Sequence, residues 1–236
     1  MKEREGTPKK PFSNLIALLE AQIAAGAGFK EESLFFKVKN LLDTELAKEG
    51  KCFTEEERKI LKDDGAKIYP IEGETIQAQM DAGRPFHYVA DRVLLLNTPS
   101  LVSEMAIYPN PNRFFVSSTL GKKLSKQEKL VKKDASQLRK RLGLKGIDEI
   151  IPQEAATVTE LLFKHRRGSK SKVWLLGESY RHLRVITKNP TDESGLRVAL
   201  VSFRFSMGPG LIVETWDRNL GFSDICAIRL IVPKRK

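Results

Sequence analysis

Five short runs of apolar residues near the C-terminus constrain the fold more than any other feature of this chain. They are rich in β-branched and aromatic residues and are separated by Gly, Pro, Asn and Asp, which is typical of strands joined by turns. The runs cover residues 172–176, 181–188, 196–205, 211–217 and 225–232. Because a parallel crossover needs about a dozen residues or more, connections this short predict an antiparallel sheet. The sequence SMGPG at 206–210 is expected to close a hairpin.

One helix is predicted directly before this sheet, over residues 153–165. Pro152 precedes it, as proline often does at the start of a helix. Val158, Leu161 and Leu162 have the spacing of one helical face. We expect this face to pack on one side of the antiparallel sheet.

The N-terminal part of the chain favours helices. Residues 1–10 have mixed charge and little apolar surface, so we expect a flexible tail. Residues 11–65 predict three helices, and the third begins at a capping box formed by Thr54 and Glu57.

Residues 66–120 give a weaker signal. A short strand is expected at 66–71 and a helical piece at 74–82, whereas 86–96 fits either a strand or a helix. The stretch 105–119 has two prolines between two β-prone runs, a pattern that predicts strand, turn and strand.

Together these patterns predict an α+β fold, with an N-terminal helical part, a basic helix and a C-terminal antiparallel sheet on which one helix packs. We expect four regions along the chain. They are a flexible tail at 1–10, a helical region at 11–83, an irregular connecting region at 84–120, and a basic helix plus antiparallel α+β domain at 121–236.

Positive charge is concentrated in two segments. The chain has 41 basic and 30 acidic residues, a net charge of +11. Ten Lys or Arg residues and two acidic residues lie between Gly121 and Gly146, and five basic residues with no acidic residue lie between Lys164 and Lys172. The rest of the chain is close to neutral. Charge concentrated in this way indicates a polyanionic partner.

The first segment contains the best-defined helix of the chain, predicted over 125–142. Ser125 and Glu128 have the spacing of a capping box, and Gly143 follows the last turn. An apolar stripe anchors the helix, and it consists of Val131, Ala135, Leu138 and Leu142. With this stripe facing the protein, the basic side chains project outward. The residues expected to contact phosphates are Lys122, Lys126, Lys129, Lys133 and Lys140.

The second segment, KHRRGSKSK, follows the helix predicted at 153–165. Part of its charge complements the negative end of the helix dipole. Its Gly and Ser residues predict a flexible loop that suits a phosphate backbone. The residues expected to bind there are Arg166, Arg167, Lys170 and Lys172.

The predicted sheet adds further candidates for nucleic-acid contact. Arg184, Arg204 and Arg229 occupy alternate positions that are expected to face outward. Trp216 could offer a stacking face beside them, as single-stranded nucleic acid requires.

No catalytic, cofactor or metal-binding motif is recognisable in the sequence. A phosphate loop, G-x-G-x-x-G, H-E-x-x-H and a serine nucleophile elbow are all absent. Asp192, Glu193, Glu214 and Asp217 lie near predicted strand ends and could hold a divalent cation in a nuclease. The interpretation we favour is that the first two form turns and Glu214 pairs with Arg204. We expect no cofactor, and binding rather than catalysis.

Nothing in the sequence predicts a membrane protein or a disulfide-rich secreted one. No run approaches the roughly 20 apolar residues of a membrane span, and the N-terminus lacks the apolar core of a signal peptide. Two cysteines, Cys52 and Cys226, do not make a disulfide framework. We expect a soluble, cytoplasmic protein with reduced thiols.

These features predict a nucleic-acid-binding protein that contacts phosphates through helix 125–142 and an adjacent basic loop. Zinc-finger spacing, an RNA-binding aromatic motif and a helix-turn-helix are not recognisable in the sequence. The sequence therefore does not distinguish RNA from DNA as the ligand. The alternatives are a solvated basic face without a partner, a module for an acidic protein partner, and a divalent-metal phosphodiesterase. A membrane surface fits less well, because the modest apolar stripe suits packing on protein.

Overall fold

The computed structural model describes residues 52–169, 174–176, 183–204 and 210–234. The chain divides into two units, Met1–Leu46 and Ala47–Lys236, and every described residue belongs to the second unit. The tail predicted at 1–10 and the first two helices predicted within 11–50 lie outside the described residues.

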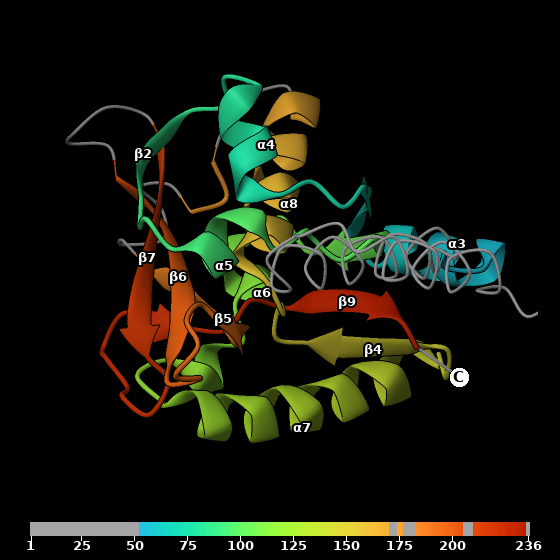
Figure 1. Ribbon diagram of the computed structural model, residues 1–236. Coiled ribbons are helices and arrows are strands. Elements are labelled where there is room, and N and C mark those ends of the chain that lie inside the picture. Colours follow the sequence, from blue (N-terminus) through green and yellow to red (C-terminus); the bar gives the residue numbers. More distant parts are fainter. Residues whose placement is uncertain (1–51, 170–173, 177–182, 205–209, 235–236) are drawn as a thin grey trace, which may run out of the picture. The chain divides into compact units, whose positions relative to one another are not determined.

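The described residues form six helices and two mainly antiparallel sheets, so the predicted α+β class is confirmed (Figure 1). The first sheet has the order β1-β3-β9-β4, and all its neighbours are antiparallel. Side chains of β3 alternate between two core clusters, as the pleat of a strand requires. The strands are β1 (Lys67–Ile71), β3 (Ser103–Ile107), β9 (Leu230–Pro233) and β4 (Ile147–Ile150).

The second sheet has the order β2-β7-β6-β5-β8. Its three central strands form the antiparallel meander that the sequence predicts. The two edge strands run parallel to their neighbours, β2 beside β7 and β8 beside β5. The strands are β2 (Phe86–Val89), β7 (Gly210–Asp217), β6 (Arg197–Arg204), β5 (Arg184–Pro190) and β8 (Ile225–Cys226).

The prediction of one strand over 225–232 is wrong, because this segment supplies β8 to one sheet and β9 to the other. Between them the backbone pairs with a different part of the chain. Val116 N–H donates to Ala227 O at 3.0 Å, and Arg229 N–H donates to Phe114 O at 2.7 Å. These bonds carry the chain from one sheet to the other, and apolar spacing alone cannot show such a crossing.

The predicted strand 172–176 is described from Trp174 onward, and there it is a buried turn. The Trp174 ring packs on Phe163 and Phe203, with ring centroids 5.5 and 4.9 Å away. Residues 206–209 of the predicted hairpin loop lie outside the described residues.

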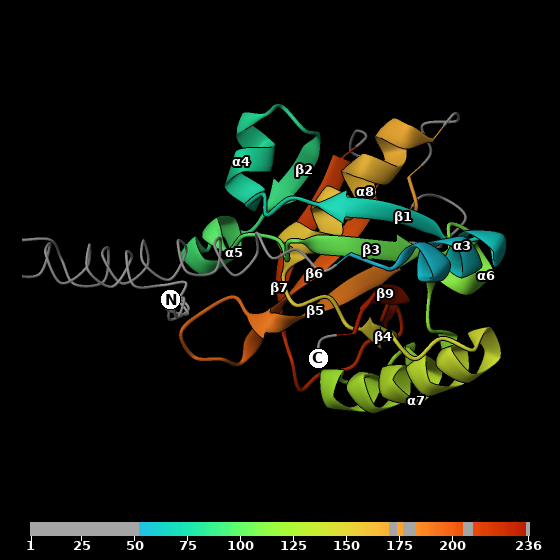
Figure 2. The same cartoon turned by 90° about the vertical axis from the view of Figure 1, so that its right-hand side faces the viewer.

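Helix α8 (Ala155–Gly168) confirms the helix predicted at 153–165. Ten of its 14 residues are buried, including Val158, Leu161 and Leu162. These side chains share one apolar cluster with strands of both sheets, so α8 lies between the sheets (Figures 1 and 2). A helix covered on nearly all sides needs apolar residues around its circumference, which explains its weak amphipathic pattern.

Two segments between 66 and 120 resolve the weaker signals of the sequence. Helix α4 (Ile76–Asp81) is the helical piece expected at 74–82. The ambiguous stretch 86–96 contains both structures, since β2 is followed by α5 (Val93–Asn97).

The prediction of strand, turn and strand over 105–119 is wrong in its second half. Helix α6 (Pro111–Phe114) and a 3₁₀ turn (Ser117–Thr119) follow β3 instead. Asn110 caps α6 by accepting a hydrogen bond from Asn112 N–H at 2.9 Å, and proline occupies the first helical position. The residues that predicted a turn therefore begin a helix.

Helix α3 (Glu55–Asp63) begins at the predicted capping box. The Thr54 side chain accepts from Glu57 N–H at 3.2 Å, and the Glu57 carboxylate accepts from Thr54 N–H at 2.9 Å. Gly65 follows the helix with a φ of +90°, a conformation that favours glycine. No helix within the described ranges has the length and apolar character needed to cross a membrane.

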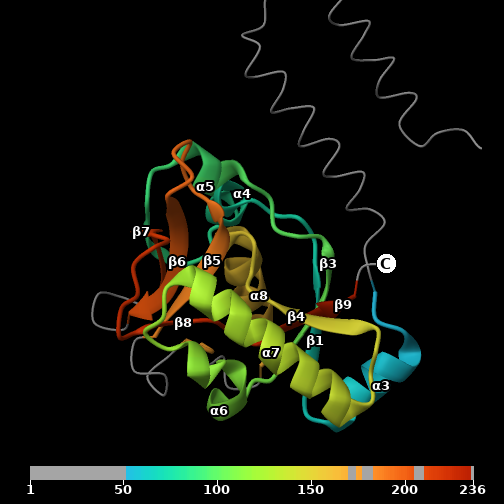
Figure 3. The ribbon, with the colours of Figure 1, turned by 90° about the horizontal axis from the view of Figure 1, so that it is seen from below.

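Helix α7 (Leu124–Leu142) packs against both sheets (Figure 3). Leu138, in its C-terminal half, joins a cluster with α3 and the first sheet. Leu124 and Val131, in its N-terminal half, join a cluster with Leu200 and the second sheet. Helices α3 and α7 thus cover the face of the first sheet opposite α8.

The pairing of β2 with β7 can be tested at Gly210. A Cβ added there would lie 2.7 Å from His87 N and 3.0 Å from the carbonyl carbon of Phe86. Gly210→Ala should therefore displace β2 and lower the free energy of unfolding by about 1–3 kcal/mol, measured by urea denaturation. Gly168→Ala is the control, because an added Cβ there meets no atom within 4 Å. Wild-type stability of Gly210→Ala would contradict the pairing.

Candidate nucleic-acid interface

The apolar stripe of α7 fixes the orientation of the basic helix. The predicted stripe residues Val131, Ala135 and Leu138 are buried, as are Leu124 and Gln127. The Gln127 side-chain amide donates to Lys122 O at 2.7 Å and holds the segment that enters the helix. The expectation that one edge of this helix is buried in the protein is therefore confirmed.

The start of α7 differs from the prediction. The helix begins at Leu124, its N-cap is Lys123, and no side chain caps it. Ser125 is already inside the first turn, so it cannot form the predicted capping box with Glu128. Glu128 instead forms an ion pair with Lys188 at 3.2 Å. The predicted end is correct, because Gly143 adopts a left-handed conformation after the last turn.

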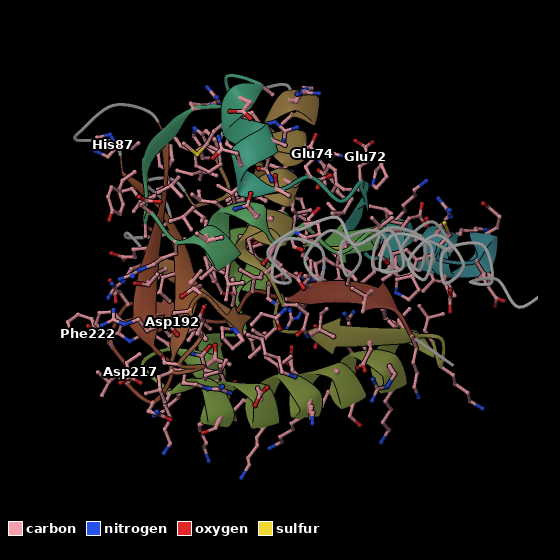
Figure 4. The ribbon with its side chains drawn as sticks, in the orientation of Figure 1. Glu72, Glu74, His87, Asp192, Asp217 and Phe222 are labelled. Atoms are coloured by element: carbon pink, nitrogen blue, oxygen red, sulfur yellow. The ribbon has the colours of Figure 1, made fainter. Side chains whose placement is uncertain are left out.

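Four lysines follow the outer face of α7. We call Lys126, Lys129, Lys133 and Lys140 the lysine ridge. Their spacing of three, four and seven residues places them on one helical face, opposite the buried stripe. All four are exposed, and no carboxylate of the described residues forms an ion pair with any of them. The ridge extends over about 21 Å, and Figure 4 shows side chains ending in nitrogen along this outer edge.

The exposed lysines of the segment continue beyond the ridge. Each of them is exposed, and none forms an ion pair with a described carboxylate. These further residues are Lys122, Lys123, Lys132 and Lys145.

The arginines at the end of α7 have a different role. Arg139 forms an ion pair with Asp148 at 2.6 Å. Arg141 donates to both carboxylate oxygens of Asp64, at 2.7 and 2.9 Å. A planar guanidinium suits such two-pronged pairing better than an ammonium group does. Two of the ten basic residues counted in this segment therefore attach the helix to the protein.

Asp64 is the centre of one polar network behind α7. Besides Arg141, it accepts hydrogen bonds from Arg113 and from the Tyr108 hydroxyl. The hydrogen bond from Arg141, together with those from Tyr108 and Arg113, holds the pKa of Asp64 well below its usual range despite partial burial. The network is a structural attachment between α3, α6 and α7.

A second polar group, formed by Asp134, Glu149 and Arg229, lies between α7 and the first sheet. Arg229 donates from Nε to Asp134 at 3.0 Å and lies 2.7 Å from Glu149 Oε1. Glu149 is fully buried. Burial and the neighbouring Asp134 carboxylate raise the pKa of Glu149 to about 8, because Arg229 offsets them only in part. Glu149 is therefore mainly protonated at neutral pH.

A polar cavity of about 300 Å³ borders these two networks. Each of its three arginines is already engaged, Arg113 and Arg141 by Asp64 and Arg229 by Asp134. Because these arginines are already paired with carboxylates, the cavity attracts an anion less strongly than three unpaired arginines would. Its lining residues are Arg113, Asp134, Gln137, Leu138, Arg141 and Arg229.

The second basic segment is only partly available for binding. Lys164 forms ion pairs with Glu160 at 3.0 Å and Glu72 at 3.1 Å. Arg166 lies over the Trp174 ring, 4.7 Å from its centroid. Arg167 is exposed. The candidates Lys170 and Lys172 lie outside the described residues.

The structure separates α7 from residues 164–169, the described part of the second basic segment, whereas the sequence predicted an adjacent basic loop. Helix α8 ends beside β1, where His165 Nδ1 lies 2.7 Å from the Tyr69 hydroxyl. Helix α7 covers the opposite face of that sheet. In Figures 1 and 2 the C-terminal end of α8 points away from α7. Arg166 and Arg167 thus do not extend the lysine ridge, because the four-stranded sheet lies between them.

The prediction of outward-facing arginines on the sheet is wrong for Arg184 and Arg229. Arg184 is largely buried and binds Glu214 at 2.9 Å and Asp224 at 2.8 Å. Arg229 is engaged by Asp134 and Glu149. Arg184 binds two half-buried carboxylates and Arg229 binds the half-buried Asp134, and no local sequence pattern predicts these distant partners.

The carboxylates considered for a metal site do not converge. Asp192 and Asp217 lie at the same end of the second sheet (Figure 4). Arg197 connects them, because its side chain lies 3.9 Å from Asp192 and its backbone is opposite Asp217 in the β6–β7 register. Glu214 precedes Asp217 by three residues in β7 and binds Arg184. The predicted pairing with Arg204 does not match the strand register, because Leu200 lies opposite Glu214 and Arg204 lies opposite Gly210. Across the residues that the structure describes, no group of three His, Cys, Asp or Glu side chains could hold a metal ion.

Glu149 makes the stability of this region depend on pH. Its folded-state pKa of about 8 lies above the ordinary value of 4.5, so the unfolded chain loses a proton that the folded protein retains. Stability should fall as the pH rises from about 5 to about 8, by about 3–4 kcal/mol. Glu149→Gln cannot ionise and should flatten this dependence in urea denaturation at pH 5, 7 and 9.

The control for this experiment is Glu193→Gln, which changes an exposed carboxylate in a turn. It should keep the pH dependence of the wild type. An equal slope in Glu149→Gln and in the wild type would show that Glu149 is not the buried acid responsible.

Sequence patterns could not identify the residues behind α7, because Asp64, Asp134 and Glu149 are far apart along the chain. The signal that could have drawn attention to Glu149 is its place in a short strand, where a charged residue interrupts the apolar pattern IDEII. No protein-family model, curated protein or solved structure matches this chain. Its function is therefore inferred from its own residues.

Proposed function

We propose that the unit Ala47–Lys236 binds the phosphate backbone of nucleic acid through the lysine ridge. The observation that carries this proposal is a row of four exposed ammonium groups without a carboxylate partner among the described residues. Each ammonium group can approach a phosphate and release a condensed counterion. Lysines are well suited to this role because they are flexible point charges.

The distribution of acidic residues on α7 supports a polyanionic ligand over a merely solvated face. Like charges three or four residues apart destabilise a helix by a few tenths of a kcal/mol per pair. The two acidic residues of the helix do not relieve this repulsion, because Glu128 binds Lys188 and Asp134 binds Arg229. The electrostatic repulsion among the ridge lysines therefore remains in the unbound protein, and a bound polyanion would remove it.

Two features of the surface favour nucleic acid over other polyanions. The ridge is straight and about 21 Å long, so it can follow several successive phosphates. A membrane-binding helix needs an apolar face that is free to insert, whereas the apolar stripe of α7 is buried. Both RNA and DNA present the phosphates that such a ridge would bind.

The cysteines are consistent with a cytoplasmic location for this activity. Cys226 is a buried free thiol, and Cys52 is exposed. Burial and the nearby Asp224 carboxylate hold the pKa of the Cys226 thiol far above its usual value. Free thiols are the usual form in a reducing compartment.

The proposal predicts salt-dependent binding of labelled RNA and DNA oligomers. If the four ridge lysines contact phosphates, the slope of log K against log salt concentration should be about −3. Changing Lys126, Lys129, Lys133 and Lys140 to Glu should weaken binding by about 100-fold or more at low salt and flatten the slope. Fluorescence anisotropy of the labelled oligomer measures both quantities.

A matched variant controls for net charge. It changes four exposed cations outside the ridge to Glu, namely Lys59, Lys62, Lys67 and Arg92. Its net charge equals that of the ridge variant, so both should have the same non-specific attraction to a polyanion. An equal loss of affinity in the two variants would contradict the proposed site, and so would tight binding by the ridge variant.

A further inference from the structure

Three large apolar side chains are exposed near the start of α7. Leu120 is 44% exposed, Leu220 53% and Phe222 52%. Exposed apolar side chains scattered singly are ordinary on a protein surface, but a group of them indicates a binding site. These three belong to two segments that are distant in sequence.

A close contact between two glycines brings those segments together. A Cβ on Gly221 would lie 2.5 Å from the carbonyl oxygen of Gly121, so the two backbones are packed against each other. Gly121 N–H also donates to Ile225 O at 2.9 Å. Gly121 is followed directly by Lys122. The exposed apolar group therefore adjoins the N-terminal end of the lysine ridge, to the left of α7 in Figure 4, where Phe222 is labelled.

The Phe222 ring is held in place although half of it is exposed. It packs edge-on against Trp216, with 5.8 Å between ring centroids. The Arg184 guanidinium lies 4.9 Å from the Trp216 centroid and 5.3 Å from the Phe222 centroid. Glu214 and Asp224 bind that guanidinium at 2.9 and 2.8 Å. An aromatic ring that is fixed in advance loses little conformational entropy when a ligand binds to it.

An exposed aromatic ring beside a row of lysines matches the chemistry of a nucleic acid with unpaired bases. Bases stack on aromatic side chains while cationic residues follow the backbone. In a duplex the faces of the bases are already covered by their neighbours, so a duplex can use the lysines but not the ring. Arg184 is largely buried and was predicted as a direct contact, but here it acts by positioning Phe222.

We propose that the lysine ridge takes single-stranded nucleic acid, with a base stacked on Phe222. This inference rests on the proposed function and adds the class of nucleic acid to it. Leu120 and Leu220 are exposed in the same two segments, and the backbone of Lys122 adjoins Gly221, the residue before Phe222.

The test compares three labelled probes by fluorescence anisotropy. They are an oligothymidylate, an abasic oligomer of the same length and charge, and a duplex of that length. The wild type should bind the oligothymidylate about tenfold more tightly than the abasic oligomer. Phe222→Ala should remove this difference and leave the affinity for the abasic oligomer unchanged. Phe222→Trp should keep it, because an indole ring also stacks.

Two controls show that the effect is specific to the ring. Tyr88→Ala removes an equally exposed aromatic side chain (54%) from β2, and it should keep the preference for bases. Phe222→Leu keeps apolar surface but loses the ring, and it should behave like Phe222→Ala. A wild-type preference in Phe222→Leu would overturn stacking in favour of a general apolar contact.

The outcomes separate this inference from the proposed function. Equal binding of the oligothymidylate and the abasic oligomer by the wild type overturns stacking but leaves phosphate binding intact. Duplex binding as tight as that of the oligothymidylate also overturns the single-strand preference. Failure to bind any probe overturns both proposals. Binding to vesicles with anionic lipids that needs Phe222, without binding to any oligomer, would assign this surface to a membrane instead.

Discussion

The burial of the apolar stripe of α7 against both sheets is the interaction on which the proposed interface depends. Leu138 packs with the first sheet, and Leu124 and Val131 pack with the second. Burying an aliphatic side chain of this size contributes about 1.5–3 kcal/mol, so the helix has one strongly preferred orientation. Helical geometry then directs the residues opposite the stripe to the solvent. The lysine ridge is thus a consequence of packing on the other side of the same helix.

On this surface the arginines attach α7 to the rest of the protein, whereas the lysines remain exposed to solvent. Arg139 and Arg141 bind carboxylates of β4 and of the end of α3, and Arg229 binds Asp134 of α7 itself. These contacts hold both sides of the helix, and the planar guanidinium makes them possible. The lysines of the ridge have no such partner among the described residues. Phe222 belongs to the same surface, because Arg184 holds its ring next to the start of the ridge.

Much of the fold could be predicted where the signal is local. The capping box of α3, the buried face of α8 and the antiparallel strands β5 to β7 were all evident from residue spacing. The predictions that failed depended on distant neighbours. The segment 225–232 divides because it pairs with residues 114–116, and Asn110 with Pro111 begins a helix where a turn was expected. The same holds for the candidate site. Its outward lysines were predicted, whereas the ion pairs of its arginines and the separation of residues 164–169 from α7 were not.

By itself the sequence determined that helix 125–142 has one apolar face and an opposite face rich in lysine, because the side chains of a helix repeat every 3.6 residues whatever surrounds them. The tertiary structure decided which cations remain exposed. An arginine is neutralised only if folding brings a carboxylate within reach, and Asp64 reaches Arg141 from 77 residues away. Folding also placed Phe222 beside Lys122, through a contact between two glycines 100 residues apart that no local pattern records.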